Sequence, residues 1–226
     1  MKVIIGLNAA MFVAQLFVPT LTDVLALRPV FVLRYLWIWQ LVTYMFLHGG
    51  LLHILFNMLA LWMFGTELER IWGTRYFLKF YFVTGVGAAL LTVGFSVLPF
   101  GFANLIYGAE TIGASGAIYG LLLAYALYFP DRPIYMYFLF PVPAKIFVII
   151  MGAIAFYASL ANAGGGTANA THLGGLLVAY LFLKGARVNP LSELKYRYLK
   201  WKSNRVRKKF DVYSGGRADD WDRRVH

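Results

Sequence analysis

The chain has 226 residues, of which 60% are apolar and 14% are charged, and its formal net charge at pH 7 is +11. Soluble domains hold fewer apolar and more charged residues, so this composition indicates a protein that lies in a lipid bilayer. No residue is a cysteine, which excludes disulfide bonds, thiolate metal sites and catalysis by a cysteine nucleophile.

Six apolar stretches follow one another along the chain and predict an all-α, multi-pass membrane protein. They comprise residues 3–19, 51–66, 76–99, 113–129, 145–160 and 171–186. Several are shorter than the ~20 residues with which a perpendicular helix crosses a bilayer. The first stretch resembles a signal peptide, but Asn8 and Gln15 interrupt it and no clear cleavage site follows, so we interpret it as a retained span. We therefore expect a bundle of six transmembrane helices within residues 1–186.

Residues 20–50 connect the first two stretches and differ from both a loop and a span. They are too apolar for an ordinary aqueous loop, and polar residues and a proline interrupt them too often for a clean span. This pattern is typical of a segment at the membrane interface. We expect the connector to be partly inserted in the outer leaflet and anchored by Trp37, Trp39 and Tyr44, because aromatic rings favour the interface.

The positive charge is concentrated at the end of the chain. Residues 187–226 hold 12 of the 21 Lys and Arg residues but only 5 of the 10 acidic residues. With the basic residues that flank the other spans, they predict that both termini lie in the cytoplasm, as in a multi-pass protein of the cell (inner) membrane. We expect residues 187–226 to form a basic tail that contacts anionic lipid headgroups. No recognition motif accompanies the charge, so nucleic acid is not an expected partner.

A few polar side chains interrupt the predicted spans, where burial of an unpaired polar group is costly. Ser115 begins the fourth span and Tyr119 follows it by one helical turn. His53 and Asn57 share a face of the second span, and His172 lies at the start of the sixth. Taken singly, each has an ordinary structural explanation, because a serine commonly bonds to its own helix and a histidine commonly ties two helices together.

Together these side chains form a set that can carry out nucleophilic catalysis. Ser115 offers a hydroxyl, His172 a base that titrates near neutral pH, and His53 with Asn57 two donors for a developing oxyanion. No carboxylate is expected near His172, so the unit would be a dyad. Glycines on the fourth and sixth spans permit the close helix packing that such contact needs. We expect Gly113, Gly116 and Gly120 on the fourth span to face a second set of small residues on the sixth, Gly174, Gly175 and Ala179.

Metal binding is the rival chemistry for the histidines. A zinc site needs three or four protein ligands, and the one pair spaced by a helical turn here consists of a histidine and an asparagine. We therefore expect no metal and no other cofactor.

Three motifs carry a resemblance to a known family. They are HGGLLHILFN at residues 48–57, GASGAIYG at residues 113–120 and ANATHLGG at residues 168–175. Because these three motifs follow one another in this order, the chain resembles the rhomboid intramembrane serine proteases of prokaryotic type over about residues 30–186. The resemblance implies a six-helix rhomboid bundle and a serine endopeptidase that cleaves transmembrane segments of other membrane proteins near the outer interface.

The resemblance also implies roles for individual residues. Ser115 would be the nucleophile and His172 its general base, with the ring of Tyr119 packed against the imidazole. His53, Asn57 and the backbone N–H of Ser115 would form the oxyanion hole. His48 would be structural, holding the connector and a polar water pocket. At position 40 many members carry arginine where this chain has glutamine, so weaker anchoring of the connector is expected at Gln40.

Two further expectations concern access to the candidate site and the alternative functions. The glycine-rich loop at residues 164–166 is expected to act as a lid over the site, because glycine permits the backbone to move. The leading alternative function is a catalytically silent rhomboid-like protein that binds membrane helices as a chaperone or sorting factor. A transporter or channel is disfavoured, because the chain has neither inverted repeats nor a path of charged residues through its spans.

Overall fold

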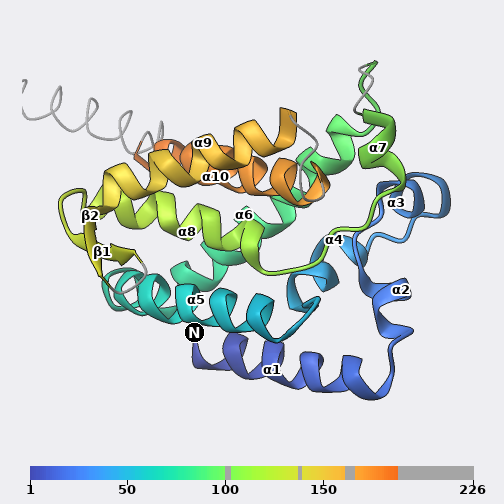
Figure 1. Cartoon of the computed structure of the whole chain (residues 1–226), viewed down its shortest axis with the longest axis horizontal. Helices are drawn as coiled ribbons and strands as arrows, with labels where there is room; N and C mark the ends of the chain where they lie inside the picture. Colours follow the sequence, from blue (N-terminus) through green and yellow to red (C-terminus); the bar gives the residue numbers. More distant parts are fainter. Residues whose placement is uncertain (100–102, 137–138, 161–165, 188–226) are drawn as a thin grey trace, which may run out of the picture. The chain divides into compact units, whose positions relative to one another are not determined.

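The computed structural model describes residues 1–99, 103–136, 139–160 and 166–187 (Figure 1). Most of the described chain is helical, which confirms the predicted all-α class. The longer helices are α1 (Lys2–Phe17), α5 (Leu51–Trp72), α6 (Thr74–Phe95), α8 (Ser115–Tyr128), α9 (Ala144–Leu160) and α10 (Gly166–Arg187). Each overlaps one of the six apolar stretches of the sequence.

Two of the described helices, α5 and α6, are long and apolar enough to cross a membrane, and α1, α8 and α9 are apolar but shorter. The number of spans therefore stays a prediction. The chain separates into a unit of Met1–Leu183 and a unit of Lys184–His226. Of the second unit only the end of α10 is described. The predicted basic tail from residue 188 onward lies outside the described residues, and the predicted boundary after residue 186 is untested.

The connector between α1 and α5 is a run of short helices. They are α2 (Leu21–Leu25), α3 (Pro29–Tyr35), α4 (Gln40–Thr43) and the 3₁₀-helix η1 (Tyr44–Phe46). Pro29 stands at the first position of α3, where its fixed φ suits a helix and its missing N–H is not needed. Leu36 ends α3 with a left-handed φ of 57°. The turns between these helices let the connector fold against other parts of the chain.

Tyr44 was expected at the membrane interface, and the structure shows that this is wrong. Its side chain is completely buried, and its hydroxyl donates to the backbone oxygen of Gly85 on α6 at 2.8 Å. Trp37 and Trp39 stack on each other with ring centroids 5.3 Å apart, and Trp39 is exposed. The hydroxyl of a buried tyrosine usually finds a hydrogen-bond partner inside the protein, and here the backbone oxygen of Gly85 is that partner.

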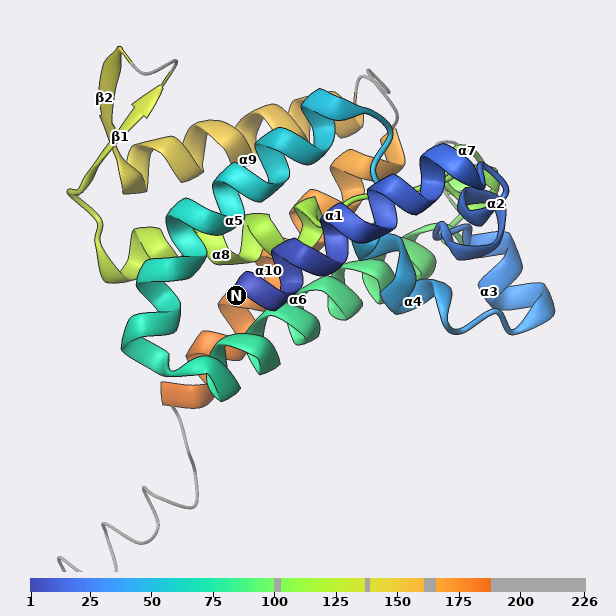
Figure 2. The ribbon, with the colours of Figure 1, turned by 90° about the horizontal axis from the view of Figure 1, so that it is seen from below.

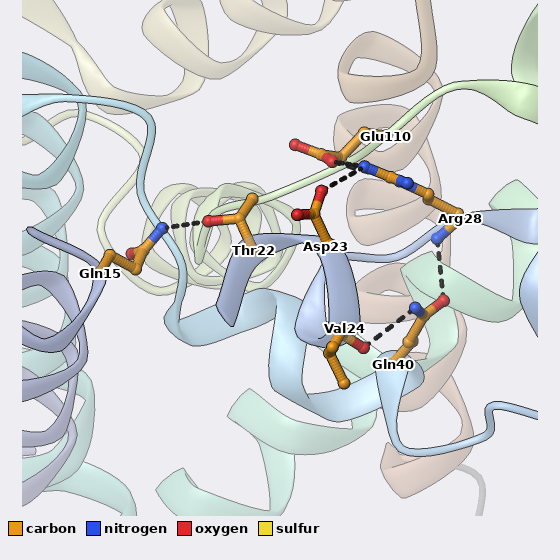
Figure 3. Close-up of polar contacts among 7 residues, drawn as sticks. All are labelled: Gln15, Thr22, Asp23, Val24, Arg28, Gln40 and Glu110. Carbon is orange, nitrogen blue, oxygen red and sulfur yellow. Dashed lines mark hydrogen bonds and ion pairs between the residues drawn. The ribbon is translucent and has the colours of Figure 1, made fainter. Parts of the chain in front are cut away.

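Gln40 makes two hydrogen bonds to the backbone of the connector. Its side chain is completely buried. The amide oxygen accepts from the backbone N–H of Arg28 at 3.1 Å, and the amide nitrogen donates to the backbone oxygen of Val24 at 3.1 Å (Figure 3). An arginine has no acceptor atom and could not make the first of these bonds. Gln40 therefore ties two parts of the connector together, and weaker anchoring relative to arginine stays a prediction.

The helix α8 lies at the centre of the packing and carries Ser115 at its first residue. It contacts α5, α6 and α9, and Figures 1 and 2 show these helices on different sides of it. Ten of its residues are buried, several of them glycine or alanine. A helix that is apolar on all sides belongs in the interior of a protein. The start of α8 is thus held from several directions at once.

Two short strands, β1 (Pro133–Met136) and β2 (Phe140–Pro143), form an antiparallel hairpin between α8 and α9. No sequence pattern predicted this hairpin. Two of the four residues of β2 are prolines, which lack the N–H that a strand ladder uses. The sequence signal for a strand is accordingly weak here.

Candidate active site

The backbone before α8 turns sharply so that Ser115 begins the helix. Gly113 has a φ of 117°, a conformation that residues with a side chain rarely adopt. Its N–H donates to the backbone oxygen of Tyr44 at 2.9 Å. The first N–H groups of a helix have no partner inside it, and the helix dipole makes this end positive. The N–H of Ser115 is therefore directed at a place suited to a negatively charged oxygen.

The hydroxyl of Ser115 lies next to the imidazole of His172 on α10. Their atoms Oγ and Nε2 are 2.7 Å apart, which is hydrogen-bond distance. In the neutral tautomer that carries its proton on Nδ1, Nε2 accepts the hydroxyl proton. The two residues are 57 positions apart in the sequence, so this contact depends on the packing of α8 against α10.

The imidazole of His172 is held by an aromatic ring. Tyr119, one turn after Ser115, stacks on it with ring centroids 4.3 Å apart and an angle of 6° between the planes. The Nδ1 atom of His172 is buried and has no hydrogen-bond partner among the described residues. Stacking rather than a carboxylate therefore orients this ring within the described part of the chain.

His53 on α5 approaches the same point from another helix. Nδ1 of His53 accepts from the N–H of Gly49 at 3.2 Å, so in the neutral ring Nε2 carries the proton and is a donor. A Cβ atom built on Gly113 would lie 2.8 Å from this Nε2 and 3.7 Å from Oγ of Ser115. The space beside Gly113 thus adjoins both a donor and a hydroxyl.

Asn57 is buried, and Nδ2 donates to the backbone oxygen of His53 at 2.8 Å. A side-chain amide has two N–H groups, so one donor remains for another partner. Its oxygen Oδ1 is buried with no partner among the described residues. The structure therefore brings His53 and Asn57 onto one face of α5, as their spacing predicts.

His48 lies just before α5, outside the long helices, and is 2% exposed. Its ring meets that of His53 edge to face, with centroids 5.0 Å apart. Its backbone N–H donates to Oε1 of Gln15 on α1 at 3.0 Å. It also lines an open pocket of about 630 Å³ whose polar walls include Gln15, Thr22 and Glu110. His48 therefore joins α1 to the loop that leads into α5.

The burial of His48 predicts a loss of stability in acid. Desolvation, reinforced by the neighbouring His53, lowers its pKa from 6.5 to about 4. The unfolded chain binds the proton first as pH falls, so the contribution of His48 is complete above pH 6.5 and is lost toward pH 4. It amounts to at most about 3 kcal/mol. We expect the Tm in detergent to fall over this range, and to fall less in His48→Gln. Equal pH dependence in both proteins would contradict the assignment.

Small residues set the distance between α8 and its neighbours. A methyl group on Gly175 of α10 would overlap with the backbone oxygen of Gly116 on α8. A methyl group on Gly120 would come within 3.2 Å of Cβ of Ala179. Gly174, which was expected to face α8, instead packs against the backbone of Ala88 on α6. Successive helical residues point in different directions, so α10 uses one glycine for each neighbour.

Gly175→Ala is expected to separate α10 from α8, because the new methyl group cannot fit beside a backbone carbonyl. A displacement of about 1 Å at a reacting pair can cost ~10²-fold in rate, and overpacking of this kind costs ~1–3 kcal/mol of stability. Cleavage kinetics and thermal unfolding in detergent would measure both effects. Gly94→Ala on α6 is the matched control, because among the described residues no atom beyond its own stretch of helix backbone lies within 4 Å of its Cβ position. Equal behaviour of the two variants would contradict the packing argument.

A polar contact next to His172 was not predicted. The hydroxyls of Thr92 on α6 and Thr171 on α10 are 2.8 Å apart and buried. This bond fixes α10 beside the residue that bears the imidazole. A threonine also bonds readily to its own helix, as Thr92 does to Ala88 at 2.9 Å, so the sequence alone does not reveal such a contact.

The glycine-rich loop that was expected to form a lid is described only in part. Residues 164 and 165 lie outside the described residues, and residue 166 begins α10.

Comparison with known proteins agrees with the resemblance. Residues 35–186 match the family model of the rhomboid domain. Rhomboid protein 1, mitochondrial, of Saccharomyces cerevisiae is 33% identical over 61% of this chain and 38% of its own length. Rhomboid protease GluP of Bacillus subtilis is 34% identical over 62% of this chain and 24% of its own. Rhomboid protease GlpG of Yersinia pestis is 30% identical over 66% and 48%. The chain thus spans less than half of each of these relatives, and its matched region is the rhomboid domain. Since that domain accounts for most of the chain, the protein belongs to the rhomboid family.

Proposed function

We propose that this protein is an intramembrane serine endopeptidase that cleaves transmembrane segments of other membrane proteins near the outer interface. The observation that carries the proposal is the 2.7 Å contact between Oγ of Ser115 and Nε2 of His172 at the start of a helix. Relatives that bear the name rhomboid protease support it. A silent helix-binding protein would not need this contact.

In the proposed reaction Ser115 attacks a peptide carbonyl while Nε2 of His172 takes its proton. The carbonyl oxygen becomes an oxyanion next to the N–H of Ser115, Nε2–H of His53 and the free N–H of the Asn57 amide. His172 then gives its proton to the leaving amine as the carbon–nitrogen bond breaks, which leaves an acyl-enzyme on Ser115. A water molecule, deprotonated by His172, attacks the ester carbon. The bond from this carbon to Oγ of Ser115 then breaks, His172 returns the proton to Oγ, and the new carboxyl end leaves.

The dyad lies partly buried between apolar helices, and this position restricts the substrate. A helical segment has its carbonyls bonded internally and shielded, so it must unwind before Ser115 can reach one. Small or helix-breaking residues lower the cost of that step. The proposal also includes a topology. The protein would cross the cell (inner) membrane six times, with both termini in the cytoplasm and the basic tail on anionic headgroups. Substrate segments would then be cut where they meet the outer leaflet.

The test uses the purified protein in liposomes with two single-pass substrates. One carries glycine and alanine at the outer end of its segment, and the other carries leucine at the same positions. We expect cleavage of the first, slow cleavage of the second and none of either by Ser115→Ala. Equal cleavage of both substrates would contradict the unwinding requirement, and failure of the wild type on both would contradict the proposed function.

A further inference from the structure

The segment that leads into Ser115 is attached to the connector at several points. Leu27 and Thr111 form an isolated antiparallel bridge, with N–H to oxygen distances of 3.0 and 2.9 Å. Two residues later the N–H of Gly113 donates to Tyr44. Leu27 and Thr111 are both buried. The segment therefore forms part of the connector's fold although it lies more than sixty residues further along the chain.

An ion pair adds a third attachment at the beginning of this segment. Nε of Arg28 donates to Oε2 of Glu110 at 3.2 Å, and Nη2 of Arg28 donates to the same oxygen (Figure 3). Nη2 also contacts Oδ1 of Asp23 at 3.3 Å. The guanidinium lies 5.5 Å from the ring centre of Phe31. Since Gln40 bonds the backbone of Arg28 as well, the arginine is fixed within the connector, and Glu110 is the side chain that it holds.

The position of the segment that leads into Ser115 affects the oxyanion donors more than the contact of Ser115 with His172. Gly113 packs directly against the ring of His53, because a Cβ atom there would lie 2.8 Å from Nε2. A shift of the segment therefore changes the distance between the N–H of Ser115 and the donor of His53. The contact of Ser115 with His172 depends instead on the close packing of Gly116 against Gly175. Loss of the ion pair should accordingly disturb the oxyanion donors and leave the dyad in contact.

We propose that Arg28 is a positioning residue that acts through Glu110, holding the segment before α8 so that the N–H of Ser115 and Nε2–H of His53 converge on one oxygen atom. This inference rests on the proposed function and adds a residue outside the family motifs to it. Both partners are partly exposed, with side chains 26% and 33% accessible. Exposed ion pairs contribute little to stability, so the effect should appear in turnover rather than in unfolding.

The experiment compares Arg28→Ala, Glu110→Ala and the double variant in full-length protein. Each single change is expected to lower kcat by ~10- to 100-fold through misplacement of donors, with KM and Tm nearly unchanged. The double variant should be no slower than either single variant, because the residues act through one another. Asp23→Asn is the matched control: it removes the other carboxylate on the same guanidinium, one that is not attached to the Ser115 segment, and should behave as the wild type.

A second measurement does not require cleavage. Hydrogen exchange of the peptide that covers residues 108–116 should be faster in Arg28→Ala and Glu110→Ala, and unchanged in Asp23→Asn. The proposal is overturned if exchange and kcat are those of the wild type, if the two single effects multiply in the double variant, or if kcat falls only in step with Tm. If the wild type cleaves and the variants match it, the proposed function stands and the role of Arg28 is wrong. If the wild type cleaves nothing, the exchange data still decide whether Arg28 holds the segment.

Discussion

Ser115→Ala and His172→Ala are each expected to abolish cleavage, with a loss of turnover on the order of 10⁶-fold, as occurs where a nucleophile and its base act as one unit. Alanine at position 115 leaves no atom to form the acyl-enzyme. Alanine at position 172 leaves the hydroxyl protonated, and no other base lies at hydrogen-bond distance from it among the contacts of the described residues. Turnover with a saturating transmembrane substrate in detergent measures both losses.

The double variant Ser115→Ala/His172→Ala should be no slower than either single variant, because neither residue works without the other. Ser96→Ala is the matched control for loss of a buried serine. Ser96 is 4% exposed and donates to the backbone oxygen of Val93 at 2.7 Å, the ordinary structural role of a serine in a helix. It should retain nearly full activity. Retention of more than about a tenth of the activity by Ser115→Ala would contradict the assignment of the nucleophile.

Asn57→Ala is expected to lower kcat by ~10²- to 10³-fold, the usual result of removing one donor from an oxyanion hole. The free N–H of this amide would bond the oxygen only after it becomes charged, so KM should change little. Steady-state kinetics against a transmembrane substrate, with thermal unfolding in parallel, would measure the effect.

Asn8→Ala is the matched control for Asn57. Asn8 is buried on α1 and, like Asn57, donates from Nδ2 to the backbone oxygen four residues earlier, at 2.8 Å. The two substitutions therefore remove intrahelical bonds of the same kind, one in α1 and one in α5, and only Asn57→Ala alters the candidate site. If Asn8→Ala slows turnover as much as Asn57→Ala, or if Asn57→Ala turns over at the wild-type rate, Asn57 does not belong to the oxyanion hole.

The long helices could be predicted because an apolar stretch of sufficient length leaves few alternatives. Lipid forces backbone groups to bond within their own segment, so composition alone indicates a helix. Ser115, His172, His53 and Asn57 could be grouped from their chemistry, and the resemblance then implied a role for each. The structure adds the distances and the stacking of Tyr119, which spacing along the chain does not determine.

The contacts that the sequence did not indicate join side chains to partners in other elements of the fold. Tyr44 was expected at the interface on the general preference of aromatic rings, but its hydroxyl reaches a backbone oxygen 41 residues away. The two hydrogen bonds of the buried Gln40 amide were not predicted either. The pair of Arg28 and Glu110 is separated by 82 residues. Such contacts follow from tertiary packing, and local patterns do not indicate them.

The most direct test of the central claim is labelling of the folded protein with a fluorophosphonate, which reacts with an activated serine, followed by mass spectrometry of the modified peptide. The account predicts a single adduct on Ser115, little adduct in His172→Ala, and none after denaturation of the wild type, since activation requires the contact between α8 and α10. Absence of the adduct from the folded wild type, in a preparation that also fails to cleave a transmembrane substrate, would contradict the account. So would an adduct on any serine other than Ser115.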